Sequence, residues 1–324
     1  TMAKKAAAIT LTEQDGEVSD DLNEILKGLS RPQKTLSSKF FYDEAGSQLF
    51  EQITELPEYY PTETELSIMR DKVGEMVELI GAEASLIEFG SGSSLKIRLL
   101  LEHMVRPAAY VPVDISRDHL LASAEQLAAD YPDIEILPVA ADFTQPFDLP
   151  SPKIPPVRNV VYFPGSTIGN FALDDARSLL KVMHQEAGEG GALLIGVDLQ
   201  KEVSVLERAY DDSAGVTAEF NRNLLRRLNR EFGADFDLDA FEHVAYYQRE
   251  RGRIEMHLKS LRDQAVTVAG QRFYFRRGES IHTENSHKYT LPGFRELAAS
   301  AGFTVHKVWT DPRNYFSVQY CLRD

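Results

Sequence analysis

Cysteine is nearly absent from this sequence, since Cys321 is the only one among 324 residues. A single cysteine excludes an intrachain disulfide and any metal site built from several cysteines. The 8 histidines show no ligand spacing such as HxxxH, so the sequence predicts no metal site. Long apolar runs are missing as well, because no stretch approaches the roughly 20 residues that a membrane-spanning helix needs.

Positive charge is also scarce. The chain has 35 Lys and Arg against 50 Asp and Glu, which gives a formal net charge of −15. Because this charge repels the phosphates of DNA and RNA, we expect no nucleic-acid partner, and a small substrate fits better. The N-terminal stretch TMAKKAAAITLTEQDGEVSDD is a poor match to a signal peptide. We therefore expect a cytoplasmic protein that acts on a small molecule, with no membrane and no obligate protein partner.

Strand-like and helix-like segments alternate from Thr62 onward. The predicted strands are 85–89, 110–115, 134–140, 159–163 and 192–199, and the predicted helices are 95–104, 117–130 and 173–187. Strands that are apolar throughout and separated by helices predict a parallel sheet covered on both faces. The fold class is therefore α/β, a doubly wound Rossmann-like sheet that binds ligands at the carboxyl ends of its strands.

The alternation stops near residue 200. Residues 201–285 contain helical and loop-like sequence and then a predicted β-meander. After Tyr289 come a helix and two strands, whose short connection makes them antiparallel. An open parallel sheet that ends in such a hairpin resembles class I methyltransferases. We expect a methyltransferase core from 64–200 plus 286–324, and a second α+β lobe that binds substrate, built from 1–63 and the 201–285 insertion.

The stretch IEFGSGSSLK (87–96) indicates a ligand-binding turn between a strand and a helix. It lacks the third glycine of a dinucleotide fingerprint, and no pyrophosphate clamp is visible, which makes NAD the weaker candidate. S-adenosylmethionine has no phosphate and needs room for its amino-acid tail. Glu88, Gly90 and Gly92 would provide that room, and Lys96 would meet the ligand carboxylate. The alternative is a tight turn with no ligand.

Two further strand ends favour S-adenosylmethionine. Asp114 would accept hydrogen bonds from both ribose hydroxyls, or else it caps the helix that follows. Asp142 would accept from the adenine amino group while Phe143 lies against the ring, or else they are a loop carboxylate and a core ring. Three successive strand ends that each offer a suitable group make S-adenosylmethionine the predicted cofactor.

The fourth strand leads into YFPGSTIGNF (162–171), which lacks the Asn-Pro-Pro-Tyr of amino-methylating DNA enzymes. Asn170 offers an amide that both donates and accepts hydrogen bonds. The alternative is that Asn170 caps the helix predicted at 173–187.

Longer runs carry a more specific resemblance. They are KFFYDEAGSQLFEQITELPEYYPTETE (39–65), GSTIGN (165–170), RAYDDSAGVTAEFNRN (208–223), FDLDAFEH (236–243), RIEM (253–256) and TENSHKY (283–289). From about Pro32 onward the chain resembles the L-histidine Nα-methyltransferases of ergothioneine biosynthesis, the EgtD family. The resemblance implies three successive methyl transfers from S-adenosylmethionine to the α-amino group of histidine, through its mono- and dimethyl forms, giving hercynine.

The resemblance also implies residue roles. Tyr42 and Tyr210 would hold the α-carboxylate, and Asn170 would orient the amino group. On chemical grounds, apart from the resemblance, Tyr42, Asn170 or water would relay the amine proton, which makes Tyr42 and Asn170 the catalytic candidates. The imidazole contacts would be Tyr59, Glu284 and Ser286, and the pocket would be completed by Phe50, Gly165, Met256 and Asn285. On the cofactor side the resemblance falls on Gly90, Lys96, Asp114, Asp142 and Phe143.

The sequence departs from the family in places, and several of these residues have alternative interpretations. Asn285 stands at a variable position, and the 257–280 segment differs in length and composition. Pattern alone also allows the PEYYP tyrosines to staple a helix starting near Thr62, Met256 to be core, and Glu284 and Ser286 to cap a helix. The competing functions are methylation of another amino acid such as tryptophan, a non-catalytic S-adenosylmethionine-binding module, and a protein methyltransferase.

Overall fold

The computed structural model describes residues 9–14, 20–91 and 94–324. The chain forms two compact units. Of the described residues, the core unit comprises 9–14, 64–91, 94–199 and 289–324, and the lobe unit comprises 20–63 and 200–288. Sequence reasoning placed the corresponding divisions at 64–200 and 286–324. Among the described residues, no helix is long and apolar enough to cross a membrane.

The core unit contains an eight-stranded sheet in the order β1-β5-β4-β3-β6-β7-β14-β13. Its strands are β1 (Thr12–Glu13), β3 (Ala84–Phe89), β4 (Ala109–Asp114), β5 (Val139–Ala140), β6 (Arg158–Phe163), β7 (Ala192–Asp198), β13 (Phe303–Thr310) and β14 (Phe316–Arg323). The six neighbouring strands β1, β5, β4, β3, β6 and β7 pair in parallel, whereas β14 is antiparallel to both β7 and β13. This confirms the predicted α/β fold of the class I methyltransferase type.

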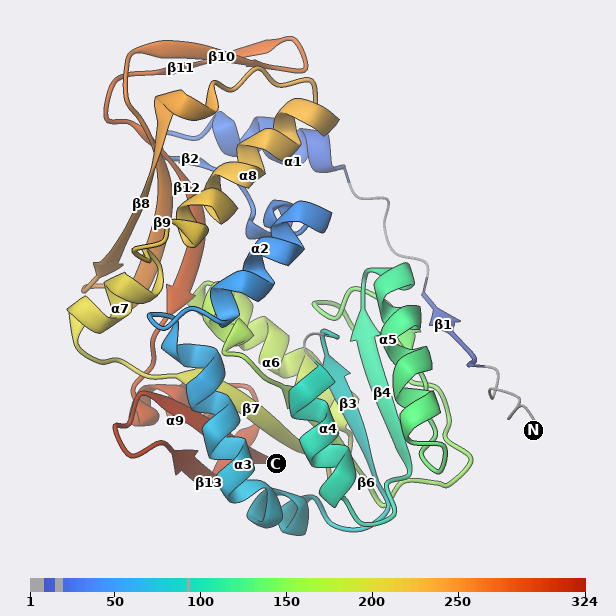
Figure 1. Cartoon of the computed structure of the whole chain (residues 1–324). Helices are drawn as coiled ribbons and strands as arrows, with labels where there is room; N and C mark the ends of the chain where they lie inside the picture. Colours follow the sequence, from blue (N-terminus) through green and yellow to red (C-terminus); the bar gives the residue numbers. More distant parts are fainter. Residues whose placement is uncertain (1–8, 15–19, 92–93) are drawn as a thin grey trace. The chain divides into compact units, whose positions relative to one another are not determined.

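Helices cover both faces of this sheet (Figure 1). One hydrophobic cluster joins the sheet to α3 (Tyr60–Ile80), α4 (Ser94–His103) and α5 (Arg117–Asp130). A second cluster joins the other face to α6 (Leu173–Ala187) and α9 (Leu291–Ser300). Burial of both faces explains why β3, β6 and β7 are mostly apolar, and so why they were recognisable in the sequence.

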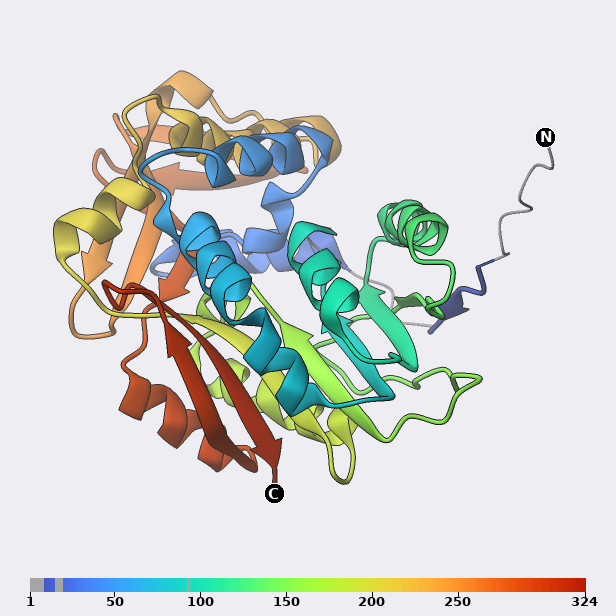
Figure 2. The same cartoon turned by 60° about the horizontal axis from the view of Figure 1, so that its bottom comes forward.

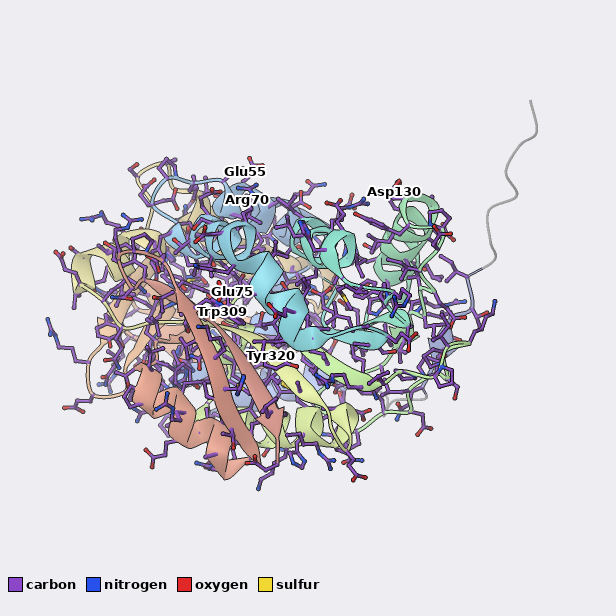
Figure 3. The ribbon with its side chains drawn as sticks, turned by 90° about the horizontal axis from the view of Figure 1, so that it is seen from below. Glu55, Arg70, Glu75, Asp130, Trp309 and Tyr320 are labelled. Atoms are coloured by element: carbon purple, nitrogen blue, oxygen red, sulfur yellow. The ribbon has the colours of Figure 1, made fainter. Side chains whose placement is uncertain are left out.

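The C-terminal hairpin of β13 and β14 continues the sheet beyond β7 (Figure 2). Trp309 and Tyr320 project from it into the cluster that contains α3, as the view from below shows (Figure 3). The Tyr320 hydroxyl donates to the carbonyl oxygen of Leu79 at 3.1 Å, and Lys307 lies 4.0 Å from the Glu75 carboxylate of α3. Helix α3 is thereby fixed against the hairpin by packing and polar contacts together.

The strand predicted at 134–140 is mostly irregular. Only Val139–Ala140 forms β5, and Ile136 makes an isolated bridge to Tyr110. Pro138 has no N–H to donate within this segment. Its carbonyl accepts from Thr12 at 3.1 Å, and the neighbouring residues pair with β1, an edge strand that the sequence did not reveal.

The lobe unit has a four-stranded sheet in the order β2-β12-β9-β8 and a separate β10-β11 hairpin. The strands are β2 (Lys34–Thr35), β8 (Phe241–Gln248), β9 (Arg253–Ser260), β10 (Gln264–Val268), β11 (Gln271–Phe275) and β12 (Ser280–His287). The helices are α1 (Asp21–Leu29), α2 (Glu44–Thr54), α7 (Val203–Ala209) and α8 (Val216–Glu231), with 3₁₀ turns η1 (Ser38–Phe41) and η3 (Leu238–Ala240). Neither β8 nor β12 was predicted, since both carry many polar residues.

Candidate functional site

The turn after β3 has the backbone that a close ligand approach requires. Gly90 has φ +89°, a conformation that residues with a Cβ rarely adopt, and its N–H donates to Val113 O at 2.8 Å. A Cβ at this position would lie 3.9 Å from the ring of Phe143. The structure therefore brings Gly90 and Phe143 together, as the cofactor prediction requires. Gly92 lies outside the described residues.

Asp114 is held at the end of β4 by three donors. Its Oδ2 accepts from the Ser91 N–H at 3.0 Å and the Ser91 hydroxyl at 2.9 Å, and its Oδ1 accepts from the Ser116 N–H at 3.1 Å. Helix α5 begins at Arg117 with Ser116 as its N-cap, so the interpretation of Asp114 as the helix cap is wrong. The carboxylate is instead oriented beside the β3 turn.

Asp142 and Phe143 follow β5. The exposed Asp142 accepts at Oδ1 from the Thr144 N–H at 2.9 Å and the Thr144 hydroxyl at 2.7 Å. The Phe143 ring is partly buried, with its centroid 5.4 Å from that of Phe89 and 5.9 Å from that of Phe163. The turn thus fixes the carboxylate while one aromatic edge stays near Gly90.

Glu88 occupies a different environment from the other predicted cofactor residues. Its side chain is buried and accepts a hydrogen bond from the Tyr110 hydroxyl on the neighbouring strand. Burial raises the pKa of Glu88 to about 8. Near neutral pH the group is therefore largely a neutral carboxylic acid within the sheet.

Lys96 is joined to a carboxylate that sequence reasoning missed. Its ammonium pairs with Glu65 of α3, whose side chain is only 1% exposed. The same Glu65 carboxylate accepts from the Gly165 N–H at 2.9 and 3.1 Å. A Cβ on Gly196 would lie 2.1 Å from Glu65 Oε2, so that glycine makes the room. Glu65 therefore connects a predicted cofactor contact, Lys96, with a predicted substrate contact, Gly165.

Asn170 ends a 3₁₀ turn, η2 (Thr167–Asn170), that follows β6. The turn is entered through Gly165 with φ +78° and Ser166 with φ +54°, and the Ser166 hydroxyl accepts from the Asp198 N–H at 2.8 Å. Helix α6 has Ala172 as its N-cap and no side-chain cap, so Asn170 does not cap it. Within the described part of the chain, no hydrogen bond engages the Asn170 amide.

Four aromatic residues predicted to contact substrate gather in the lobe unit. Ring centroids are 5.8 Å apart for Tyr42 and Phe50, 6.5 Å for Phe50 and Tyr59, and 5.9 Å for Tyr59 and Tyr210. Phe220 of α8 supports the group at 5.8 Å from Tyr42. Residues that are far apart in the sequence thus form one edge-to-face cluster.

Local hydrogen bonds fix Tyr42 at the entrance of α2. Tyr42 ends η1, and Asp43 caps α2 by accepting from the Gly46 N–H at 2.8 Å. The Asp43 carboxylate also accepts from Asn223 at 2.9 Å and Arg230 at 2.8 Å, which ties the turn to α8. A Cβ on Gly46 would lie 1.6 Å from Phe41 O, so only glycine allows this tight turn.

Tyr210 is held through its backbone. His243 of β8 donates from Nε2 to Tyr210 O at 2.8 Å and accepts at Nδ1 from Asn221 at 2.8 Å. This is the neutral tautomer, consistent with burial lowering the pKa of His243. Glu58 accepts from the Ser213 N–H at 2.7 Å, which joins the loop bearing Tyr59 to the loop after Tyr210.

The Tyr42 hydroxyl lies in a desolvated, electron-rich environment. Burial and the nearby Glu284, Tyr59 and Tyr210 raise the pKa of Tyr42 well above its usual value. The side chain as a whole nevertheless stays 44% exposed. Tyr42 is therefore accessible and remains a neutral phenol throughout the physiological pH range.

Strand β12 sets the orientation of the imidazole-binding candidates. Glu284 pairs directly with Met256 of β9, and Ser286 pairs with Ile254, so Glu284 and Ser286 share one face. Asn285 points to the opposite face, where it pairs with Glu255. The interpretation of Glu284 and Ser286 as a helix cap is wrong, because both lie inside the strand.

The Glu284 side chain is partly buried, and its carboxylate is unshared. Burial raises the pKa of Glu284 to about 7, and the positive charge of Lys288 opposes that rise. None of the hydrogen bonds found within 20–91 and 94–324 uses this carboxylate. A carboxylate buried without a partner is costly, which favours a position that a polar ligand completes.

A buried polar network braces this region, and Asn221 is its centre. Its amide donates to His243 at 2.8 Å and to His257 O at 3.1 Å, and its oxygen accepts from the Thr283 hydroxyl at 2.8 Å. Thr283 occupies the irregularity of β12 just before Glu284. The network therefore couples the Tyr210 backbone to the start of the TENS segment.

We expect Asn221→Ala to destabilise the protein by about 3 kcal/mol, because it removes the donor to the buried His243 Nδ1 and to His257 O and leaves the Thr283 hydroxyl with Met256 O alone. Urea denaturation measures this loss. Arg226→Ala, an exposed change on the same helix, should stay within about 0.5 kcal/mol of the wild type. Equal stability of the two variants would show that the network does not brace the fold.

The opposite face of the lobe sheet carries Glu255, His257 and His282, whose possible ligand atoms lie within 4.8 Å of one another. Sequence spacing missed this group because it spans two strands. The two imidazoles stack at 4.5 Å with planes 11° apart, and Arg253 donates to Glu255 at 2.9 Å. In-plane lone pairs of parallel rings do not converge on one ion, and the guanidinium already neutralises the carboxylate. The group is therefore arranged as an ion pair with stacked neutral rings.

This group predicts a specific pH dependence of stability. Burial lowers the pKa of both His257 and His282, so the folded state resists protons that the unfolded chain takes up near pH ~6.5. Their stabilising contribution is complete above that pH and is lost as the pH falls towards the lowered pKa. Urea denaturation between pH 7.5 and 5 should show a steeper loss for the wild type than for His282→Gln. Parallel pH profiles would contradict this assignment.

Comparison with known proteins identifies the family of the chain. The family model described as histidine-specific methyltransferase, SAM-dependent, matches residues 21–323. The histidine N-alpha-methyltransferase of Mycolicibacterium smegmatis is 43% identical over 93% of this chain and 94% of its own length. Its Mycobacterium tuberculosis counterpart is 39% identical with the same coverage. Ergothioneine biosynthesis protein 1 of Neurospora crassa is 31% identical over 87% of this chain but only 32% of its own length. The chain belongs to the family of histidine-specific, S-adenosylmethionine-dependent methyltransferases.

Proposed function

We propose that this protein transfers three methyl groups from S-adenosylmethionine to the α-amino nitrogen of L-histidine and releases hercynine, the first step of ergothioneine biosynthesis. The observation that carries the proposal is the pairing of Glu284 with Met256 across two strands, with Ser286 on the same face. Glu284 and Ser286 match the two polar groups of an imidazole ring, and the adjacent tyrosine cluster supplies hydroxyls for a carboxylate.

The core unit fits S-adenosylmethionine. The positive φ of Gly90 permits close approach of an amino-acid tail, and the Phe143 ring nearby offers an apolar face for adenine. Asp114, oriented by Ser91 and Ser116, still has acceptor capacity for ribose hydroxyls. The bound cofactor supplies an electrophilic methyl group on a sulfonium.

The protein's own task is alignment and proton handling. The amine attacks only when neutral, and desolvation beside a positive sulfonium lowers the pKa of an ammonium. Because the Tyr42 hydroxyl stays protonated, it is not a strong base. It relays a proton by accepting one from the amine while it passes its own hydroxyl proton on. The Asn170 amide does not titrate, and it orients the amine by hydrogen bonding.

Tryptophan is the second candidate substrate, since its indole also fits an aromatic pocket. Its single N–H would satisfy at most one of Glu284 and Ser286, so tryptophan would make one hydrogen bond fewer than histidine there. Met256 also fills the space opposite Glu284. The same residues count against a non-catalytic S-adenosylmethionine-binding module, which has no use for an amino-acid pocket.

The test is an endpoint assay in which the protein and S-adenosylmethionine are incubated with each of the twenty amino acids separately. Mass spectrometry should find three added methyl groups on histidine and none on the others. Methylation of tryptophan instead would overturn the pocket assignment. Cofactor binding without any methylated product would favour the non-catalytic module or a peptide substrate.

A further inference from the structure

Strand β12 carries one residue more than the strand β9 beside it (Figure 1). His282 pairs with His257 of β9, and Glu284 pairs with Met256, so Thr283 is inserted between two successive pairs. An inserted residue of this kind is a β-bulge, which re-aims side chains and is common next to active sites. The part of β12 that carries the imidazole-binding candidates therefore begins at a bulge.

The bulge decides which face of the lobe sheet receives Glu284. Side chains alternate along a regular strand, so residues 282 and 284 would share a face. Here His282 lies on the face of His257. Glu284 instead lies on the face of Met256, the next residue of β9, and Ser286 lies there too. Without the insertion, Glu284 and Ser286 would turn away from this face, which we call the site face.

On the site face, the inserted residue is held by its own side chain. Thr283 is buried, and its hydroxyl lies 2.8 Å from Asn221 Oδ1 and 3.1 Å from Met256 O. The hydroxyl has one proton and donates it to these two acceptors. Because Asn221 belongs to α8 and Met256 to β9, Thr283 joins the bulge to a helix and to the neighbouring strand.

On the opposite face, His282 holds the bulge through the backbone. Its Nε2 lies 3.1 Å from Glu284 O, and since a carbonyl only accepts, this nitrogen carries a proton and donates it. The nearest Glu255 oxygen is 3.8 Å from Nε2, which is beyond hydrogen-bond distance. The ring also stacks on His257 at 4.5 Å between centroids. His282 is therefore oriented so that it binds the backbone of Glu284.

We propose that His282 and Thr283 are positioning residues that fix the β12 bulge from its two faces and so hold Glu284 on the site face, where it recognises the imidazole. Both act through Glu284 and not by contact with the substrate. The inference rests on the proposed function and adds the residues that set its specificity. A small rotation of the Glu284 backbone is enough to weaken binding, because the carboxylate must meet the ring from one direction.

The test measures histidine affinity by isothermal titration into the full-length protein saturated with S-adenosylhomocysteine. At about pH 8 both His257 and His282 are neutral, because burial lowers their pKa values. His282→Leu removes the donor to Glu284 O and should weaken histidine binding about tenfold. Thr283→Val removes the hydroxyl at nearly constant volume and should have a similar effect. Should the buried Thr283→Val fail to fold, the partly exposed His282 decides the test alone.

Conservative variants separate the hydrogen bonds from the bulk of the side chains. His282→Gln keeps an N–H donor and Thr283→Ser keeps the hydroxyl, so both should bind histidine about as tightly as the wild type. Tyr246→Phe is the matched control, since it removes a 3.0 Å hydrogen bond to Glu255 on the face of His282. It should leave histidine affinity unchanged. S-adenosylhomocysteine affinity should be unchanged in every variant, and a cooperative urea transition shows that each one is folded.

A double-mutant cycle shows whether His282 acts through Glu284. In the Glu284→Ala background the carboxylate that it positions is gone, so His282→Leu should cause little further loss of histidine affinity. A further tenfold loss in that background would show that His282 supports the pocket in general, and the proposal would then fail.

The outcomes separate this inference from the proposed function. Unchanged histidine affinity in folded His282→Leu and Thr283→Val would overturn the inference alone. Joint loss of histidine and S-adenosylhomocysteine affinity would assign the two residues to the fold and would also overturn it. Failure of histidine to bind the wild-type protein would remove the proposed function and the inference with it.

Discussion

Glu284→Ala should raise the KM for histidine roughly ten- to hundredfold while leaving S-adenosylhomocysteine affinity unchanged. The substitution removes the acceptor that the second ring nitrogen needs, and that nitrogen then stays desolvated and unpaired. The effect is large because burial already raises the pKa of Glu284 to about 7, a sign that few protein dipoles compensate its charge. Steady-state kinetics give the KM for histidine, and calorimetry gives the affinity for S-adenosylhomocysteine.

Glu284→Gln is the informative companion to Glu284→Ala, because its amide keeps a hydrogen-bonding group but cannot share a proton with the ring. It should recover part of the lost affinity at a pH where imidazole is neutral. The exposed Glu242 of β8 offers a matched control, and Glu242→Ala should leave both affinities unchanged. An equal loss of histidine and cofactor affinity in Glu284→Ala would contradict the assignment of Glu284 to the imidazole.

Glu65→Ala should reduce the free energy of unfolding by about 3–5 kcal/mol and weaken cofactor binding strongly. The substitution leaves the Lys96 ammonium, with its side chain 12% exposed, beside an empty acceptor position. It also removes the acceptor of the Gly165 N–H, at the entrance of the turn that carries Asn170. Urea denaturation and titration with S-adenosylhomocysteine measure the two losses.

A double variant separates stability from binding. Glu65→Gln with Lys96→Met removes both charges but keeps an oxygen for the Gly165 N–H. Because a buried ion pair can often be replaced at little net cost, this variant should recover most of the stability. Cofactor affinity should stay weak if Lys96 meets the ligand carboxylate. Full recovery of affinity would assign Lys96 a structural role only.

The sequence predicted the core unit well because local and global signals agree there. Helices α5 and α6 begin and end at the predicted residues, and strands β3, β6 and β7 are mostly apolar because both of their faces are buried. The prediction of a strand over 134–140 was wrong in length, although the composition of this segment is strand-like. Pro138 and the pairing with β1 limit the strand to two residues.

The lobe unit was harder to predict for a physical reason. Strand β12 reads SIHTENSH, and its buried hydroxyls, those of Thr283 and Ser286, are satisfied by Asn221, Lys288 and Tyr210. Such burial depends on partners far along the chain, which no local pattern contains. The strand therefore had no apolar alternation to reveal it.

In the candidate site, too, some features were predictable from the sequence and others were not. The resemblance supplied Tyr42, Tyr210, Glu284 and Ser286 as contacts, and the structure places them in one unit. The direct pairing of Glu284 with Met256 requires the strand register, and a register cannot be derived from either segment alone.

The supporting residues were missed because their roles are tertiary. Glu65, His243 and Lys288 act on functional groups through hydrogen bonds, and each belongs to a run that carried the resemblance. The available signal was that membership: PTETE contains Glu65, FDLDAFEH contains His243, and TENSHKY contains Lys288. Composition and spacing could not show which atoms they contact.

The measurement that tests the central claim most directly is tandem mass spectrometry of the product formed from histidine and S-adenosylmethionine. The account predicts three methyl groups on the α-nitrogen, revealed by loss of neutral trimethylamine, with an unmodified imidazole fragment. Methyl groups on the ring nitrogens would contradict it, because Glu284 and Ser286 would then not hold the imidazole away from the transferred methyl group.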